Sequence, residues 1–124
     1  SVGIGTQTPG NYRLAVNGSI RAKEIVVETG WADFVFEPGY DLRPLEEVEA
    51  HIREHGHLPD IPSAKEIEEH GVKVGEMHSK LLAKVEEMTL HMIDMNKRMK
   101  VLEQENESLR ERMNALTAGE RTVK

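Results

Sequence analysis

The sequence predicts an α+β protein in which short N-terminal strands and a small helical head precede a long C-terminal coiled-coil helix. A heptad repeat predicts the long helix, and alternating apolar residues among glycines predict the strands. Two weakly amphipathic segments between them predict the head. We expect a fibre-type β segment over 1–30, the head over 31–75, the coiled coil over 76–118 and a frayed tail over 119–124.

The heptad repeat is the strongest pattern in the chain. From about Glu76 to Ala118 there is neither proline nor glycine, and the apolar residues recur every seven positions. Such a repeat places its a and d residues in one seam along a helix, which is typical of a coiled coil. The predicted oligomerisation residues are His78, Val85, Met92, Met99, Asn106 and Met113 at a, and Leu81, Met88, Met95, Leu102, Leu109 and Leu116 at d.

The residues beside the seam favour parallel chains. In a parallel coil each g residue faces the e residue five places later on the neighbouring chain, which pairs Arg98 with Glu103 and Glu105 with Arg110. Asn106 at an a position is typical of dimers, whereas the Leu- and Met-rich seam also accommodates three strands. The predicted partner is the chain itself, as a parallel homotrimer with a dimer as the runner-up.

Four further apolar residues widen the N-terminal end of this helix outside the seam. We expect them to receive the short helices and the aromatic patch of the head. They are Met77, Leu82, Leu90 and Ile93.

The N-terminal segment has the alternation of a strand. Apolar residues alternate over 14–22, and the phase flips at Ile25 and Val27, which predicts a bulge or bend near residues 23–24. Two or three short strands do not form a stable sheet alone. We therefore expect strands over 12–28 to intertwine with strands of other copies.

Two short helices are predicted within residues 41–75. Pro44 suits the first position of one helix and Gly56 the position after its end. Ser63 and Glu66 form a capping box for the other. The residues expected to pack the head are Trp31, Phe34, Phe36, Leu45, Val48 and Ile52.

Composition excludes several classes of function. The chain has no cysteine, so disulfide staples and thiolate metal sites or nucleophiles are excluded. A net charge of −6 argues against a nucleic acid partner. No apolar run approaches the ~20 residues of a membrane span, so we expect no membrane insertion. The chain starts Ser-Val-Gly without an initiator methionine, so we expect it to be part of a longer protein.

The opening residues carry a family resemblance. The run Val2-Gly3-Ile4-Gly5-Thr6, followed by Pro9, Leu14 and Val16-Asn17-Gly18-Ser19-Ile20-Arg21-Ala22-Lys23, resembles a segment of phage tail fibres and related bacterial surface fibre proteins. The stretch from Trp31-Ala32-Asp33-Phe34-Val35-Phe36 through Gly56-His57-Leu58-Pro59-Asp60-Ile61-Pro62-Ser63 to the heptads is similar to the C-terminal end of the same proteins.

That resemblance implies a structural module rather than an enzyme. The layout is similar to a reduced intramolecular chaperone domain of endosialidase-type tail spikes, which drives trimerisation of the upstream fibre. The implied function is a non-enzymatic trimerisation and folding module at the C-terminus of a tail-fibre-like or cell-surface protein. The implied location is extracellular, on a phage virion, an injection particle or a bacterial cell surface.

Self-cleavage remains an alternative within that resemblance. Many members of the tail-spike family cut themselves off with a Ser/Lys dyad in a Ser-Asp-x-Arg-x-Lys motif. The nearest match here, Ser19-Ile20-Arg21-Ala22-Lys23, lacks the Asp and is one residue shorter. In a strand Ser19 and Lys23 would be ~13 Å apart, too far for the lysine to act as a base on the serine. We expect ordinary strand residues there.

Several residues of the head and of the long helix are candidate ligand-binding residues. His51, His55 and His57 have spacing that can grip a metal, and His78 could meet its copies on a trimer axis to bind an anion or a metal. The methionine stripe could bind copper, and Gly3-x-Gly5 lacks the strand–turn–helix context of a phosphate loop. We expect the three histidines of the head to form a solvated face and the methionines to pack in the core of the coiled coil. We expect no metal and no cofactor.

Two further function classes stay open. A receptor-binding adhesin tip would bind a cell-surface glycan or protein through the head, and exposure of Trp31, Phe34, Phe36 and Tyr40 would favour it. An intracellular dimeric coiled-coil adaptor fits the heptads alone, but it fits the glycine-rich opening poorly.

Overall fold

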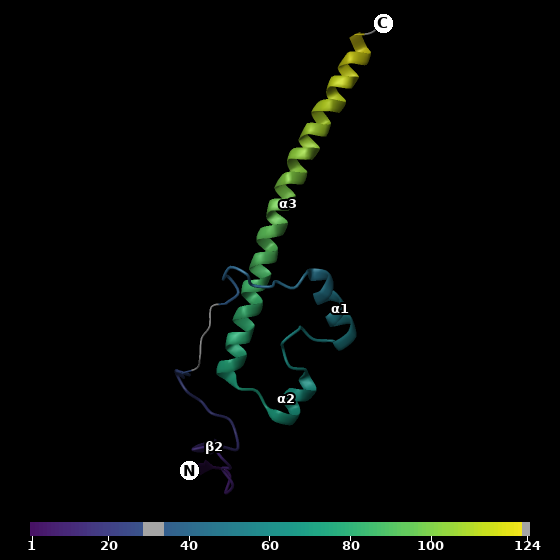
Figure 1. Ribbon diagram of the computed structural model, residues 1–124. Helices are drawn as coiled ribbons and strands as arrows, with labels where there is room; N and C mark the ends of the chain where they lie inside the picture. Colours follow the sequence, from purple (N-terminus) through teal and green to yellow (C-terminus); the bar gives the residue numbers. More distant parts are fainter. Residues whose placement is uncertain (29–33, 123–124) are drawn as a thin grey trace.

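The computed structural model describes residues 1–28 and 34–122 and confirms an α+β chain with a long C-terminal helix (Figure 1). In chain order, its elements are β1 (Val2–Ile4), β2 (Leu14–Val16), α1 (Leu45–His55), α2 (Ala64–His70) and α3 (Val74–Thr122).

The two strands pair in parallel, with Val2 opposite Leu14 and Ile4 opposite Val16. The Val2 N–H donates to the Arg13 carbonyl (2.7 Å), which extends the pairing by one bond. Gly3 is required by a close approach of the chain, because a Cβ there would lie 2.4 Å from the Thr6 carbonyl oxygen. The opening motif thus forms a small closed loop.

The predicted strands over 12–28 form only in part. Within the described chain β2 ends at Val16, and residues 17–28 form no strand, so the bulge predicted near residues 23–24 is absent. A strand needs a hydrogen-bonded neighbour, and one chain offers none to this segment. Intertwining with other copies stays a prediction.

The head helices begin and end at predicted signals. Pro44 is the residue before α1 rather than its first helical residue, because its ψ of 147° is extended. Gly56 ends α1 in the left-handed conformation (φ 74°), and its N–H donates to the Ile52 carbonyl (2.8 Å). The Ser63 hydroxyl accepts from the Glu66 N–H (3.2 Å), which confirms the N-terminal cap of α2.

α3 is longer than predicted. It spans 49 residues, roughly 70 Å, starting at Val74 rather than Glu76 and running through Gly119 to Thr122. The expected end at Ala118 is therefore wrong. A glycine costs a helix only ~1 kcal/mol, which does not stop a helix of this length.

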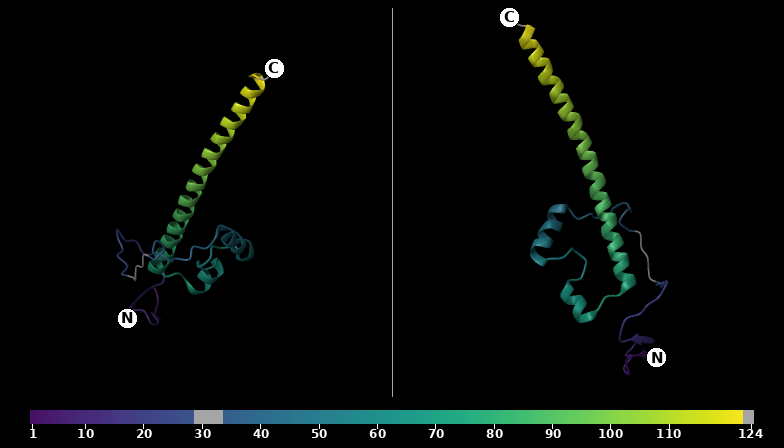
Figure 2. Two further views of the ribbon diagram at one scale, coloured as in Figure 1. Left: turned by 45° about the horizontal axis from the view of Figure 1, so that its top comes forward. Right: turned by 180° about the vertical axis from the view of Figure 1, so that it is seen from behind.

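The head lies beside only the N-terminal half of α3. α1 and α2 lie on one side of that half, residues 34–43 cross it, and the C-terminal half extends away from the rest of the chain (Figures 1 and 2). No helix among the described residues is long and apolar enough to cross a membrane.

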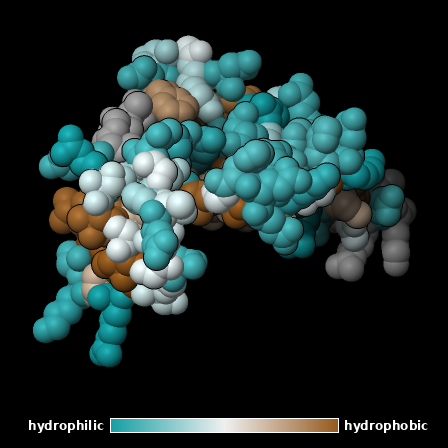
Figure 3. Space-filling view, turned by 90° about the horizontal axis from the view of Figure 1, so that it is seen from below, coloured by the Kyte–Doolittle hydropathy of each residue, from teal (hydrophilic) through white to brown (hydrophobic). Residues whose placement is uncertain are grey.

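A single chain has almost no hydrophobic core. Val35, 2% exposed, and Pro59 are the buried apolar side chains in the described part of the chain. By contrast, 28 large hydrophobic residues there are exposed. Seen from below, hydrophobic patches reach the surface between hydrophilic ones (Figure 3). The fold therefore leaves most of its large apolar side chains at the surface of the single chain.

Candidate functional site: an exposed heptad seam

The predicted seam lies open along α3. All ten of its apolar members are exposed, from 48% at Met95 to 70% at Leu116, and the polar members His78 and Asn106 are exposed as well. The ten are Leu81, Val85, Met88, Met92, Met95, Met99, Leu102, Leu109, Met113 and Leu116. An exposed apolar stripe of this length, interrupted at Asn106, is typical of an interaction surface.

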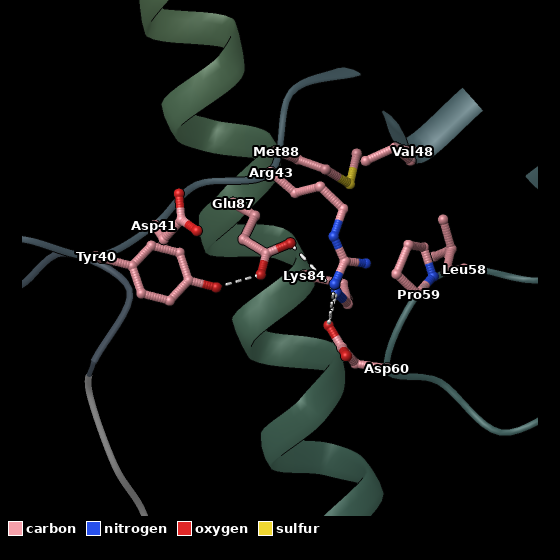
Figure 4. Close-up of a pocket in the computed structure, with 10 residues that line it drawn as sticks. All are labelled: Tyr40, Asp41, Arg43, Val48, Leu58, Pro59, Asp60, Lys84, Glu87 and Met88. Carbon is pink, nitrogen blue, oxygen red and sulfur yellow. Dashed lines mark hydrogen bonds and ion pairs between the residues drawn. The ribbon is translucent and has the colours of Figure 1, made fainter. Parts of the chain in front are cut away.

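The head is attached to a different face of the same helix. The Tyr40 hydroxyl donates to Glu87 Oε1 (2.5 Å), and the Lys84 ammonium donates to the other oxygen of Glu87 (3.3 Å; Figure 4). His91 Nε2 donates to the Arg43 carbonyl (3.1 Å). In the heptad frame these helix residues occupy c and g positions, so the head holds the flank and leaves the seam uncovered.

Asp60 completes this attachment from the turn between α1 and α2. Its carboxylate accepts from Lys84 (3.1 Å) and lies 3.8 Å from the Arg43 guanidinium. Asp60 has a left-handed backbone, with φ 68°. The hydrogen bond from Lys84 lowers the pKa of Asp60 below its ordinary value, against the opposing effect of burial.

Some of the contacts between the head and α3 are partly buried. The Lys84 side chain is 12% and the Glu87 side chain 17% exposed, so this ion pair is shielded from water more than typical surface pairs, whereas Asp60 is 66% exposed. Burial, together with the Glu87 carboxylate, raises the pKa of Tyr40 to about 12. We call Tyr40, Arg43, Asp60, Lys84 and Glu87 the latch.

The latch is not apparent from the sequence. Lys84 and Glu87 are spaced for a local helix pair, which the sequence does show. Nothing in the sequence indicates that Tyr40 and Asp60 reach them, since those contacts span 24 or more positions. The pairing of Arg43 with Asp60 is likewise not visible in the sequence.

The predicted head-packing residues do not form a core within one chain. Phe34, Phe36, Leu45 and Ile52 are exposed, Val48 is half-buried, and Trp31 lies outside the described residues. Phe34 contacts the Tyr40 ring, with centroids 5.8 Å apart. Among the apolar residues outside the seam, Met77, Leu82 and Leu90 are half-buried, whereas Ile93 is exposed.

The charged flank of the seam is partly engaged within the chain. Arg98 Nε lies 3.1 Å from Asp94 Oδ2, one helical turn earlier, so its predicted pairing with Glu103 of a neighbour competes with this local bond. Within the described residues, Glu105 and Arg110 make no ion pair in their own chain. Their pairing across chains stays a prediction.

The three histidines of the predicted cluster do lie close together. The rings of His51, His55 and His57 lie 4.5–6.1 Å apart, centroid to centroid. The Nδ1 atoms of His51 and His57 donate to backbone carbonyls, at 3.0 and 2.9 Å. In the described part of the chain no group of three or more His, Cys, Asp or Glu residues is arranged to hold a metal.

The serine–lysine pair lies in a segment without regular structure. Ser19 and Lys23 are both exposed in residues 17–28, where no strand forms. The strand geometry used to judge their spacing is therefore absent within one chain.

No family model, curated protein or solved structure matches the chain. The seam and the latch are therefore the features from which a function can be inferred.

Proposed function

We propose that this chain is a non-enzymatic trimerisation and folding module, in which three α3 helices form a parallel, in-register coiled coil. The observation that carries the proposal is the open seam: ten apolar residues at heptad spacing are exposed while the latch holds the head on another face.

The energetics favour association. Each exposed seam residue has about half of its side-chain surface left to bury, which is worth ~1 kcal/mol. Ten of them supply on the order of 10 kcal/mol per chain, before the entropy cost of association. A chain that buries only Val35 and Pro59 among the apolar side chains of its described part gains most of its stability by assembling.

The flanks of the seam favour three chains over two. In a parallel coil the g residue Met77 faces the e residue Leu82 of its neighbour, so an apolar pair adjoins the seam at its N-terminal end. Two-stranded coils leave e and g positions largely to charged residues. Apolar e and g positions widen the contact face of each helix, as a third chain requires.

The setting of this module is proposed from the opening motif. Parallel chains place all three β1–β2 loops at the same end, where they continue into an upstream fibre. We place the module at the C-terminus of a tail-fibre-like or cell-surface protein, outside the cell, as part of a phage virion, an injection particle or a bacterial surface.

The exposed aromatics favour an adhesin tip as the second candidate. Phe34 and Phe36 are exposed, and the Phe34 ring contacts the ring of the half-buried Tyr40. If this patch binds a glycan or a surface protein, Phe36→Ala will abolish attachment to target cells while the mass in solution stays unchanged. A variant that attaches normally counts against this candidate.

The deciding measurement for trimerisation is the mass in solution, by light scattering after size exclusion. We expect about 42 kDa, three times the 14.0 kDa of one chain. A mass of about 28 kDa would indicate a dimer and would favour the intracellular coiled-coil adaptor. A mass of 14.0 kDa would overturn both.

Orientation is tested with single cysteines, since the chain has none of its own. Leu116→Cys stands in the seam near the end of α3, so oxidation will cross-link parallel chains there. Ala115→Cys, one residue away at a c position, is the matched control and will stay uncross-linked. Absence of a cross-link at residue 116 in a trimer of the expected mass would exclude the parallel, in-register arrangement.

A further inference from the structure

We propose that α1 of each chain packs its apolar stripe against α3 of the neighbouring chain, so that the three heads form a closed ring around the coil. This inference rests on the proposed function, because the occupant of the stripe is a second copy of the same chain.

The first observation is that the apolar stripe of α1 is half-buried in its own chain only at Val48. Leu45, Val48 and Ile52 recur at helical spacing, yet Leu45 is 46% and Ile52 43% exposed. A helix of 11 residues is marginal in water unless it packs its apolar face. The stripe therefore needs a partner outside the described chain.

The second observation is where the stripe lies. Between α1 and α3 is a hollow of about 110 Å³ that the latch residues and Asp41 line on one side (Figure 4). Its apolar wall on the head side consists of Val48, Leu58 and Pro59. Met88 lines the same hollow from α3, and Met88 is a d residue of the seam. The hollow is thus continuous with the seam, and a chain that covers the seam also reaches α1.

The heptad frame identifies which surface of the neighbour arrives there. The latch holds the head on the g flank of α3, through Lys84, while His91 on the same flank bonds Arg43. In a parallel coil the g flank of one chain faces the e flank of the next. The neighbour therefore presents its e and adjoining b positions, which include Leu82, Thr89 and Ile93.

The heights of the two surfaces agree. α1 runs beside the N-terminal half of α3 (Figures 1 and 2), and in-register chains bring the same half of the neighbour to the same height. Ile93 of that half is an exposed apolar residue outside the seam. Every chain offers one α1 stripe and one e/b face. Three such contacts therefore close a ring in which each stripe is paired with one face.

The experiment cross-links the two surfaces. The variant Leu45→Cys with Ile93→Cys gives each chain one cysteine on α1 and one on the e/b face. Oxidation of the assembled protein is expected to produce covalent dimers and trimers on a denaturing gel. In the control, Glu47→Cys with Ile93→Cys, the α1 cysteine is exposed on the other side of the helix, and cross-linking will be at least tenfold weaker.

The outcomes separate this inference from the proposed function. Covalent trimers in the first variant alone support α1 docking on the neighbour. A 42 kDa particle that gives only single chains on the gel, or equal cross-linking in both variants, overturns the docking and leaves the coiled-coil trimer standing. A 14.0 kDa particle overturns both.

Discussion

Leu102→Asp is the sharpest test of the assigned seam. Leu102 is a d residue in the half of α3 that extends beyond the head, and it is 57% exposed in one chain. Full burial of a leucine side chain is worth ~1.5–3 kcal/mol, so the seam has ~1–1.5 kcal/mol left to recover there in each chain. Over three chains the variant forfeits ~3–4.5 kcal/mol.

The introduced charge adds a larger cost. Three aspartates would meet in one layer of the coil, and each loses hydration worth several kcal/mol without an opposite charge nearby. The total is on the order of 10 kcal/mol, which lowers the association constant by about seven orders of magnitude. We expect the mass to fall from about 42 kDa to 14.0 kDa in light scattering.

Val101→Asp is the matched control, because Val101 is a neighbouring c residue that is 52% exposed. It adds the same charge to the same turn and is expected to leave the mass unchanged. A Leu102→Asp protein that remains fully associated would refute the heptad frame. Equal dissociation of both variants would refute it too, since the seam would then not be confined to a and d.

Three other predictions concern single residues. Asn106→Leu will raise the melting temperature and broaden the distribution of oligomers, because a polar a residue fixes register at a cost in stability; an unchanged melting curve and mass would remove that role. Ser63→Ala will cost ~1 kcal/mol locally, so the Glu66 amide, which loses its acceptor, will exchange about fivefold faster. The raised pKa of Tyr40, about 12 against an ordinary 10.0, stabilises the head fully below pH 10 and less as pH rises towards 12. Titration of phenol absorbance in a Tyr12→Phe background will show it, and ionisation at pH 10 would contradict the bond to Glu87.

The parts of this fold that were predictable are those that local sequence determines. The heptad positions follow from the seven-residue spacing of apolar side chains, which can be read directly from the sequence of α3. Gly56 ends one helix through its backbone conformation, and Ser63 caps the other through its side chain. The extent of α3 through Gly119 was missed because one glycine is a weak stop within a long helix.

The parts that were not predictable depend on distant residues or on other chains. The Tyr40–Glu87 bond joins positions 47 apart, and no local pattern links them. Residues 17–28 have the alternating pattern of a strand but form none. The alternation determines which side chains share one face of a strand, but it does not identify the second strand with which that strand would pair. The seam could be identified from sequence, but the flank on which the head sits could not.

The latch also sets an order of events during synthesis. Its head residues, 40, 43 and 60, leave the ribosome before Lys84 and Glu87, and most of the C-terminal half of α3 follows later still. A nascent chain can therefore dock its head on its own helix flank before the distal heptads exist. If the head binds α3 first, it occupies the g flank, and the seam is then the surface that stays available to other chains. Premature contacts between unfinished chains would then be disfavoured, because the distal half of α3 that aligns them is still missing.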